Sequence, residues 1–200
     1  MIEVHGMTRQ SFMMRGAVAA GSVYGVSAVG PFVRQALAQA GGGDVEVLNF
    51  ALTLEYLEAA FYEQALKDTR GLAGEAKEIA TTLRDNETEH VDALTAAIKQ
   101  AGGKPVAAPG VDFGDAFASQ DSFLKLAQTF EDLGVSAYNG AATQIKSKDV
   151  LGSAGAIVQV EARHAAAIRA LRGEPITDGA FDKALKQDEV LAAAKPFIAA

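Results

Sequence analysis

Two of the three histidines in the chain stand three residues after a glutamate, a spacing that suits the binding of a metal ion. The two pairs are Glu87 with His90 and Glu161 with His164. Residues three apart lie on one face of an α-helix, so the carboxylate and the imidazole of each pair can reach the same ion. The third histidine, His5, has no glutamate at this spacing.

A second pattern precedes each of these pairs. Glu55 has Tyr62 seven residues later, and the same spacing recurs further along the chain. There Glu131 is followed by Tyr138. The chain thus repeats one order, a glutamate with its tyrosine and then a Glu-x-x-His pair, which indicates an internal two-fold repeat. Each unit of the repeat offers two carboxylates and one imidazole.

All six of these acidic and imidazole side chains lie on the apolar stripe of a predicted helix. Leu83 and Leu94, for example, flank the first Glu-x-x-His pair at helical spacing. An ionised carboxylate in an apolar core is costly unless its charge is balanced, and these stripes carry no lysine or arginine. Two divalent cations would balance four carboxylates. Carboxylate oxygen with imidazole nitrogen suits iron or manganese better than a metal that prefers sulfur.

Helical periodicity begins after three glycines at 41–43 and predicts the elements that position these residues. The predicted helices run over 45–68, 75–100, 121 or 122 to 148, and 152–172. Asp44 is the predicted N-cap of the first helix. The connection at 103–120 is long enough to cross the bundle from end to end, so the second and third helices can run parallel. The sequence therefore predicts an all-α four-helix bundle with a long crossover between helices two and three, plus a short tail helix near 188–195.

The whole pattern resembles the ferritin-like di-iron carboxylate proteins, in which two helices each supply a glutamate and the other two each supply a Glu-x-x-His pair. The segments NFALTLEYLEAAFYEQAL and FDKALKQDEVLAAAKPFI look like an exported bacterial branch of this family, whose relatives are described as stress- or desiccation-associated. The resemblance covers about residues 44–200. It implies that the metal ligands are Glu55, Glu87, His90, Glu131, Glu161 and His164.

The resemblance also implies roles for residues around these ligands. Tyr62 and Tyr138 would lie just behind them, where a tyrosine can hydrogen-bond a ligand or pass an electron. Glu87, together with Glu131 or Glu161, would bridge the two ions. On the first helix Glu58 also lies on an apolar face, and it is an alternative to Glu55 as the ligand or a residue at an interface.

Two functions follow as expectations from the resemblance. The first is a di-metal oxidoreductase with two iron ions, ferroxidase- or peroxidase-like, that reacts with oxygen or peroxide in stress protection outside the cytoplasm; two manganese ions would give a catalase-like variant. The second is a non-catalytic bundle, for binding or structure, whose metal only stabilises the fold. A reactive site needs a path for small molecules, whereas a stabilising one can be closed. An oligomer is compatible with either function.

Residues 1–40 differ from the rest and resemble an export signal that is cleaved. MTRQSFMMRG is basic, 16–33 carries no charge, and Ala38-Gln39-Ala40 ends in the small-x-small pattern of a cleavage site. The signal is twin-arginine-like, but Gln10 stands in place of the second arginine. We expect a periplasmic or extracellular protein with its bundle at 41–200; an uncleaved anchor or a buried first helix is the alternative. A net charge of −7 provides no basic surface for binding nucleic acid. The absence of cysteine excludes thiolate metal sites.

Overall fold

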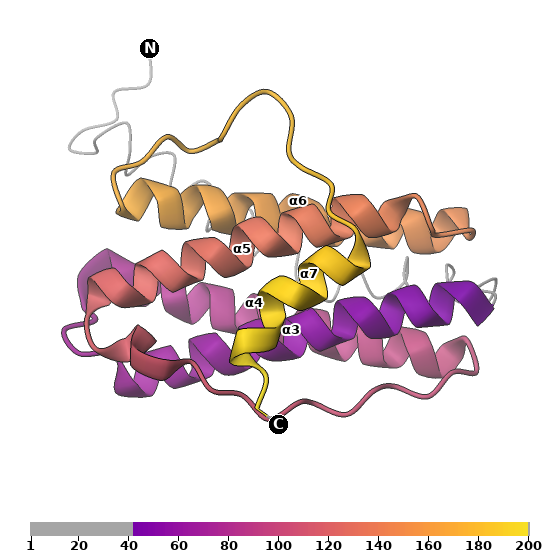
Figure 1. Cartoon of the computed structure of the whole chain (residues 1–200), viewed down its shortest axis with the longest axis horizontal. Coiled ribbons are helices and arrows are strands. Elements are labelled where there is room, and N and C mark those ends of the chain that lie inside the picture. The colour runs from indigo at the N-terminus through magenta and orange to yellow at the C-terminus, as the bar shows by residue number, and fades with distance from the viewer. Residues whose placement is uncertain (1–41, 200) are drawn as a thin grey trace, which may run out of the picture.

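The computed structural model describes residues 42–199, and over that range the chain is helical, as predicted. The four long helices are α3 (Gly42–Asp68), α4 (Gly74–Gln100), α5 (Gln120–Ala142) and α6 (Lys148–Leu171). They lie side by side as a bundle, and the short α7 (Gln187–Ala194) lies across its outside (Figure 1). No helix in this range is both long enough and apolar enough to span a membrane. The predicted export signal lies outside the described residues.

The bundle consists of two helical hairpins that are joined by the long crossover at 101–119. The crossover contains a short 3₁₀ turn at Gly114–Phe117. Tyr62 on α3 hydrogen-bonds Glu131 on α5, and Tyr138 on α5 hydrogen-bonds Glu55 on α3. These crossed pairs require α3 and α5 to run antiparallel, because Tyr62 and Tyr138 each follow the glutamate of their own helix. Since α3 and α4 form a hairpin, α4 and α5 run parallel, as the length of the crossover allowed.

The junction between α5 and α6 differs from the prediction. The third helix was expected to end near residue 148 and the fourth to begin at 152, but the turn lies earlier, at 143–147. Ser147 begins α6 because its hydroxyl accepts a hydrogen bond from the backbone N–H of Val150, which is an N-cap contact. The cap therefore determines the start of α6, where periodicity alone gave a start one turn too late.

The prediction that Asp44 caps the first helix was wrong. Helix α3 begins at Gly42, so Asp44 lies inside its first turn. The Asp44 carboxylate instead accepts hydrogen bonds from the backbone N–H groups of Lys146 (2.8 Å) and Ser147 (2.9 Å). Only 1% of Asp44 is exposed. This contact ties the start of α3 to the turn between α5 and α6, two segments that are far apart in sequence.

The two ends of the bundle are packed differently. One end is filled by phenylalanines from α3, α5 and the crossover, all buried: Phe61, Phe113, Phe117, Phe123 and Phe130. The Phe61 and Phe130 ring centroids are 5.0 Å apart, in the edge-to-face arrangement that aromatic pairs favour. The other end is filled mainly by alanine and aliphatic side chains, including Leu52, Leu94 and Ile157. The six predicted site residues lie between these two ends.

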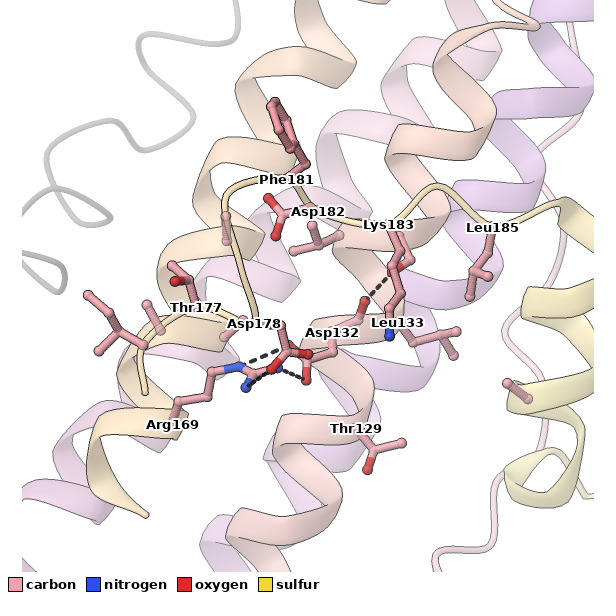
Figure 2. A pocket seen from close by; sticks show the side chains of 17 residues that line it. Thr129, Asp132, Leu133, Arg169, Thr177, Asp178, Phe181, Asp182, Lys183 and Leu185 are labelled. Carbon is pink, nitrogen blue, oxygen red and sulfur yellow. Dashed lines mark hydrogen bonds and ion pairs between the residues drawn. The ribbon is translucent and has the colours of Figure 1, made fainter. Parts of the chain in front are cut away.

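The segment 173–186, which we call the strap, leaves the end of α6, arches past the edge of the bundle and returns to α7 (Figure 1). Its residues line a cleft together with residues of α5 and α6. The Arg169 guanidinium of α6 anchors the strap through ion pairs with Asp132 of α5 (2.5 Å) and Asp178 of the strap (2.9 Å). Figure 2 shows these pairs on the wall of a cleft of about 360 Å³ beneath the strap. At the strap's end, the Leu185 N–H donates to the carbonyl oxygen of Ser136 (3.0 Å).

The C-terminal segment completes the phenylalanine-filled end of the core. Val190 and Ala194 of α7 are fully buried, and the ring centroids of Phe197 and Phe130 are 4.9 Å apart. An isolated bridge between Val111 and Ile198 then joins the end of the chain to the crossover. The tail helix, which was predicted at 188–195, is therefore part of the folded domain.

Candidate metal centre

The structure brings the six predicted site residues together in one layer across the bundle. Helix α3 supplies Glu55 and α5 supplies Glu131, while α4 and α6 each supply a Glu-x-x-His pair. All four glutamates are fully buried. Their ligand-type atoms form two groups, each within 4.8 Å, namely Glu55, Glu87, His90 and Glu161, and Glu87, Glu131, Glu161 and His164. The two groups share Glu87 and Glu161, but each has its own histidine. We call them the His90 half and the His164 half.

In the His90 half, one imidazole nitrogen faces three carboxylates. His90 Nδ1 lies 3.2 Å from Glu55 Oε2, 3.1 Å from Glu87 Oε2 and 3.0 Å from Glu161 Oε1. A single N–H cannot donate well to three oxygens in different directions. The nitrogen and the three oxygens instead have the arrangement of ligands around a common point.

The His164 half shows the same crowding. His164 Nδ1 lies 2.9 Å from Glu87 Oε1, 3.4 Å from Glu131 Oε2 and 3.8 Å from Glu161 Oε2. Five buried atoms of the site make no hydrogen bond of acceptable geometry within residues 42–199. They are Glu87 Oε1, Glu131 Oε2, both Glu161 oxygens and His164 Nδ1. Such buried polar atoms cost free energy unless something satisfies them. Cations bound in the two halves would satisfy these atoms, so the donor set fits a pair of metal ions.

Glu87 and Glu161 each divide their two oxygens between the halves. For each residue, one oxygen lies near His90 Nδ1 and the other near His164 Nδ1. Glu55 approaches only the His90 half and Glu131 only the His164 half. This arrangement suits a pair of ions with two bridging and two terminal carboxylates. Of the two bridging pairs that the sequence left open, the geometry favours Glu87 with Glu161.

The tyrosines are crossed between the two units of the repeat. The Tyr62 hydroxyl donates to Glu131 Oε1, and the Tyr138 hydroxyl donates to Glu55 Oε1. Each tyrosine therefore holds the glutamate that precedes the tyrosine of the other unit, which fixes the orientation of that carboxylate. Burial raises the pKa of both tyrosines well above the usual value, with the nearby carboxylates adding to the effect. Both hydroxyls therefore keep their protons.

Glu58 is a further carboxylate in the same core. Only 3% of it is exposed, and it lies beside the site without belonging to either half. It fits because α5 has a glycine opposite: a Cβ at Gly134 would lie 3.2 Å from Glu58 Oε1 and 3.5 Å from Glu161 Oε2. The sequence offered Glu58 as an alternative to Glu55, but the structure places both inside the bundle.

Asn86 is a site residue that the sequence did not indicate. Its Nδ2 atom lies 3.0 Å from His164 Nε2, and its side chain is buried between α4 and α6. A histidine that binds a metal through Nδ1 carries its proton on Nε2. A half-turn of the Asn86 amide then presents its oxygen to that proton. Asn86 is thus placed to orient the His164 ring toward an ion.

Burial and charge distribute the protons of the metal-free site unevenly. Burial raises the pKa of Glu55 well above the usual value and that of Glu131 to about 8. For Glu87 and Glu161, burial also acts upward, but the two imidazoles outweigh it and the pKa falls. Burial alone would lower the pKa of both histidines, whereas the carboxylates raise it. In the metal-free site, the shifts in pKa therefore favour protons on both imidazoles and on Glu55 and Glu131, and disfavour them on Glu87 and Glu161.

Comparison with known proteins agrees with this geometry. No curated protein matches the chain. The family model described as a ferritin-like domain matches residues 43–174, which include all six site residues. This match spans most of the chain and all four long helices of the bundle. The chain therefore belongs to the ferritin-like domain family.

Proposed function

We propose that this protein is a di-metal carboxylate protein that holds two iron or two manganese ions and reacts with oxygen or peroxide. The observation that carries the proposal is the set of buried oxygen and nitrogen atoms that face one another without hydrogen-bonding. Four carboxylates would neutralise two divalent ions, and the two imidazoles complete a ligand set that suits iron or manganese. Such ions, when bound, supply the electrons that reduce dioxygen or peroxide.

The chain's own residues would prepare the site for that chemistry. The tyrosine hydroxyls orient Glu55 and Glu131, and Asn86 orients His164. Burial, followed by the neighbouring carboxylates, raises the pKa of Glu58 well above its usual value. Glu58 therefore holds a proton beside Glu161, where a reduced oxygen species would need one. The surrounding helices exclude bulk water from the buried glutamates.

The site of action is part of the proposal. The export-signal pattern in residues 1–40 and the resemblance to stress-associated relatives support a role in oxidative or metal stress outside the cytoplasm. The oxidation of ferrous iron by oxygen or peroxide would remove two sources of damage there. Fractionation of the native host with an antibody against the bundle tests this part, and recovery of the full-length protein in the cytoplasm would contradict it.

Metal content is the direct test of the site. We expect about two iron or manganese ions per chain in protein purified from its native compartment and measured by elemental mass spectrometry. Glu87→Gln removes one bridging charge and should lose at least one ion. Glu78→Gln is the matched control, because Glu78 is an exposed glutamate on the same helix. A folded wild type that neither contains these metals nor takes them up would refute the proposal.

Deep burial of the four glutamates supports a second candidate function, in which the metal only stabilises the bundle. In that case zinc and iron should raise the melting temperature alike, because both would cross-link the same four helices. Ferrous protein prepared without oxygen and then exposed to oxygen or peroxide separates the two functions. An absorbance change from ferric carboxylate formation supports the oxidoreductase, and an unchanged ferrous spectrum supports the stabilising role.

A further inference from the structure

A small apolar pocket lies in the end of the bundle that is filled by alanine and aliphatic side chains. Its lining includes Ala51, Leu94, Ala97, Tyr138, Ala154 and Ile157, and we call it the alanine pocket. Its cavity volume is about 30 Å³. Ser153 also lines it, but the Ser153 hydroxyl donates to the Asp149 carbonyl oxygen. Because the Tyr138 hydroxyl donates to Glu55, both hydroxyls of the lining already have partners.

Helix register places the alanine pocket directly beside the His90 half of the metal centre. Ala51 lies four residues before Glu55 on α3. Leu94 lies four residues after His90 on α4, and Ile157 lies four residues before Glu161 on α6. Four residues are about one helical turn, roughly 5.4 Å along the axis. Three helices thus carry the lining one turn above their ligands, and Tyr138 of α5 connects the pocket to Glu55.

The internal repeat shows what the other half has in the same place. The positions equivalent to Ala51, Leu94 and Ile157 are Ala127, Ile168 and Leu83, one turn from the ligands of the His164 half. There the core is closed by large rings, since Phe61 packs on Phe123 at 5.5 Å and Tyr62 packs on Phe123 at 6.1 Å between centroids. The equivalent lining residues are all buried. The two halves therefore differ in what fills the core beside them, large rings in one and small aliphatic side chains in the other, although their glutamates and histidines follow the repeat.

The size and chemistry of the pocket select its occupant. A cavity must hold roughly 10–15 Å³ to admit one water molecule, but apolar cavities stay dry and take up apolar molecules such as xenon. A hydrated ferrous ion or a peroxide would have to give up hydrogen bonds that this lining cannot replace. Dioxygen is uncharged, apolar and small. Val47, Ala93 and Ala154 of the lining are half-buried, so the pocket has a mouth toward the surface.

We propose that the alanine pocket is the route by which dioxygen reaches the metal centre, and that dioxygen arrives at the His90 half. This inference rests on the proposed function and adds two statements to it. The oxidant is dioxygen delivered through an apolar path, and the two metal positions are unequal because only one adjoins that path. Metal ions and peroxide would have to enter elsewhere.

Xenon tests the path without any metal. Crystals of the wild type under xenon pressure should show xenon between Leu94, Ile157 and Tyr138. Ala154→Leu adds three carbon atoms at the mouth of the pocket and should remove the xenon. Ala156→Leu is the matched control, because Ala156 is a half-buried alanine two residues further along α6 that does not line the pocket. Ordered water in place of xenon in the wild type would overturn the proposal.

Rapid mixing tests the delivery of dioxygen. Each protein is loaded with ferrous iron without oxygen, its iron content is measured, and it is then mixed with dioxygen or with peroxide. The second-order rate with dioxygen should fall about tenfold in Ala154→Leu and stay unchanged in Ala156→Leu. The rate with peroxide should be the same in both variants. Equal dioxygen rates in the two variants would overturn the route while leaving the metal site intact, whereas a wild type that takes up neither iron nor manganese would refute the proposed function itself.

Discussion

At the scale of single residues, the centre depends on side chains that serve more than one neighbour. Glu87 and Glu161 each face both histidines, and each tyrosine holds a glutamate from the other unit of the repeat. A substitution at one of these positions therefore disturbs both halves. Substitutions one step further out are more informative, because they test the support of a ligand and leave the ligand in place.

Asn86→Leu tests the support of His164. Leucine has nearly the same shape as asparagine but cannot hydrogen-bond the imidazole, so the ring loses the contact that orients its Nδ1 atom. Loss of such a supporting contact typically weakens metal affinity about 10- to 100-fold. Competition with a chelator of known affinity measures the change. An affinity equal to that of the wild type would show that packing alone orients the ring.

The proton distribution predicts opposite pH dependences for metal binding and for metal-free stability. Binding of two ions must displace protons from Glu55, Glu131, His90 and His164, about four per pair of ions, so affinity should rise with pH. Calorimetry at pH 7 in buffers with different ionisation enthalpies counts the released protons. A count near zero would mean that the site is already deprotonated before metal binds.

Metal-free stability should fall over the same range of pH. The folded protein holds the Glu131 proton up to about pH 8, whereas the unfolded chain releases it near 4.5. The raised pKa values of the two histidines act in the same direction above 6.5. Glu87 and Glu161, whose pKa values are lowered, lose their contribution only below 4.5. The free energy of unfolding should therefore decline between pH 5 and 8, by about 1.4 kcal/mol per pH unit for each proton held, and urea titrations would measure the slope.

The sequence predicts the centre well because its signals are local. Glu-x-x-His and the glutamate–tyrosine spacing each lie within two helical turns, and all six residues meet in the structure. The role of Asn86 could not be predicted, because its partner, His164, is 78 residues away on another helix. The apolar face of the first helix indicates Glu58 only as an alternative to Glu55 or as a residue at an interface. Gly134 faces Glu58 across the bundle, where a Cβ would lie 3.2 Å from Glu58 Oε1, and periodicity on one helix does not reveal that neighbour.

At the scale of elements, the sequence predicts the number, the order and the direction of the helices. It does not predict the position of the turn between α5 and α6. The turn between α5 and α6 is set by the Ser147 cap and by the Asp44 carboxylate from the start of α3. The Asp44 contact joins residues about 100 positions apart, so it has no local signature. Apolar periodicity continues through such a turn, and this is why the predicted third helix ran about six residues too far.

Alanine substitutions at two helical glycines should have opposite effects on stability, because only Gly140 lies against the strap. A Cβ at Gly140 of α5 would lie 1.8 Å from the backbone oxygen of Leu185, so Gly140→Ala must push the strap away and should cost about 1–3 kcal/mol. Gly155 of α6 has no such neighbour, so Gly155→Ala should stabilise by about 0.5–1 kcal/mol through helix propensity. Urea denaturation of both variants checks the opposite signs. Proteolysis within residues 173–186 should become faster in Gly140→Ala and stay unchanged in Gly155→Ala.

At the scale of the whole molecule, the repeat gives the protein two similar halves whose ends are packed differently: phenylalanines fill one end, and the C-terminal segment adds to that packing. Phe197 packs on Phe130 and helps to close the phenylalanine-filled end, and nothing equivalent covers the alanine pocket among the described residues. The family match ends at residue 174, before this segment begins. The shared domain thus carries all six glutamates and histidines and the phenylalanines of α3, α5 and the crossover, and the additional chain adds Phe197 to the closed end.

That difference has a mechanical consequence. Voids are what hydrostatic pressure removes, so the alanine-lined end should be the compressible one and the phenylalanine-filled end the stiff one. In methyl NMR spectra recorded under increasing pressure, the signals of Ala51 and Ala97 should shift steeply and nonlinearly, while that of Ile168 should move little. Xenon, by filling the void, should abolish the contrast. A bundle with an internal two-fold repeat would then have a soft end and a stiff end, and the layer of buried glutamates and histidines would be the boundary between them.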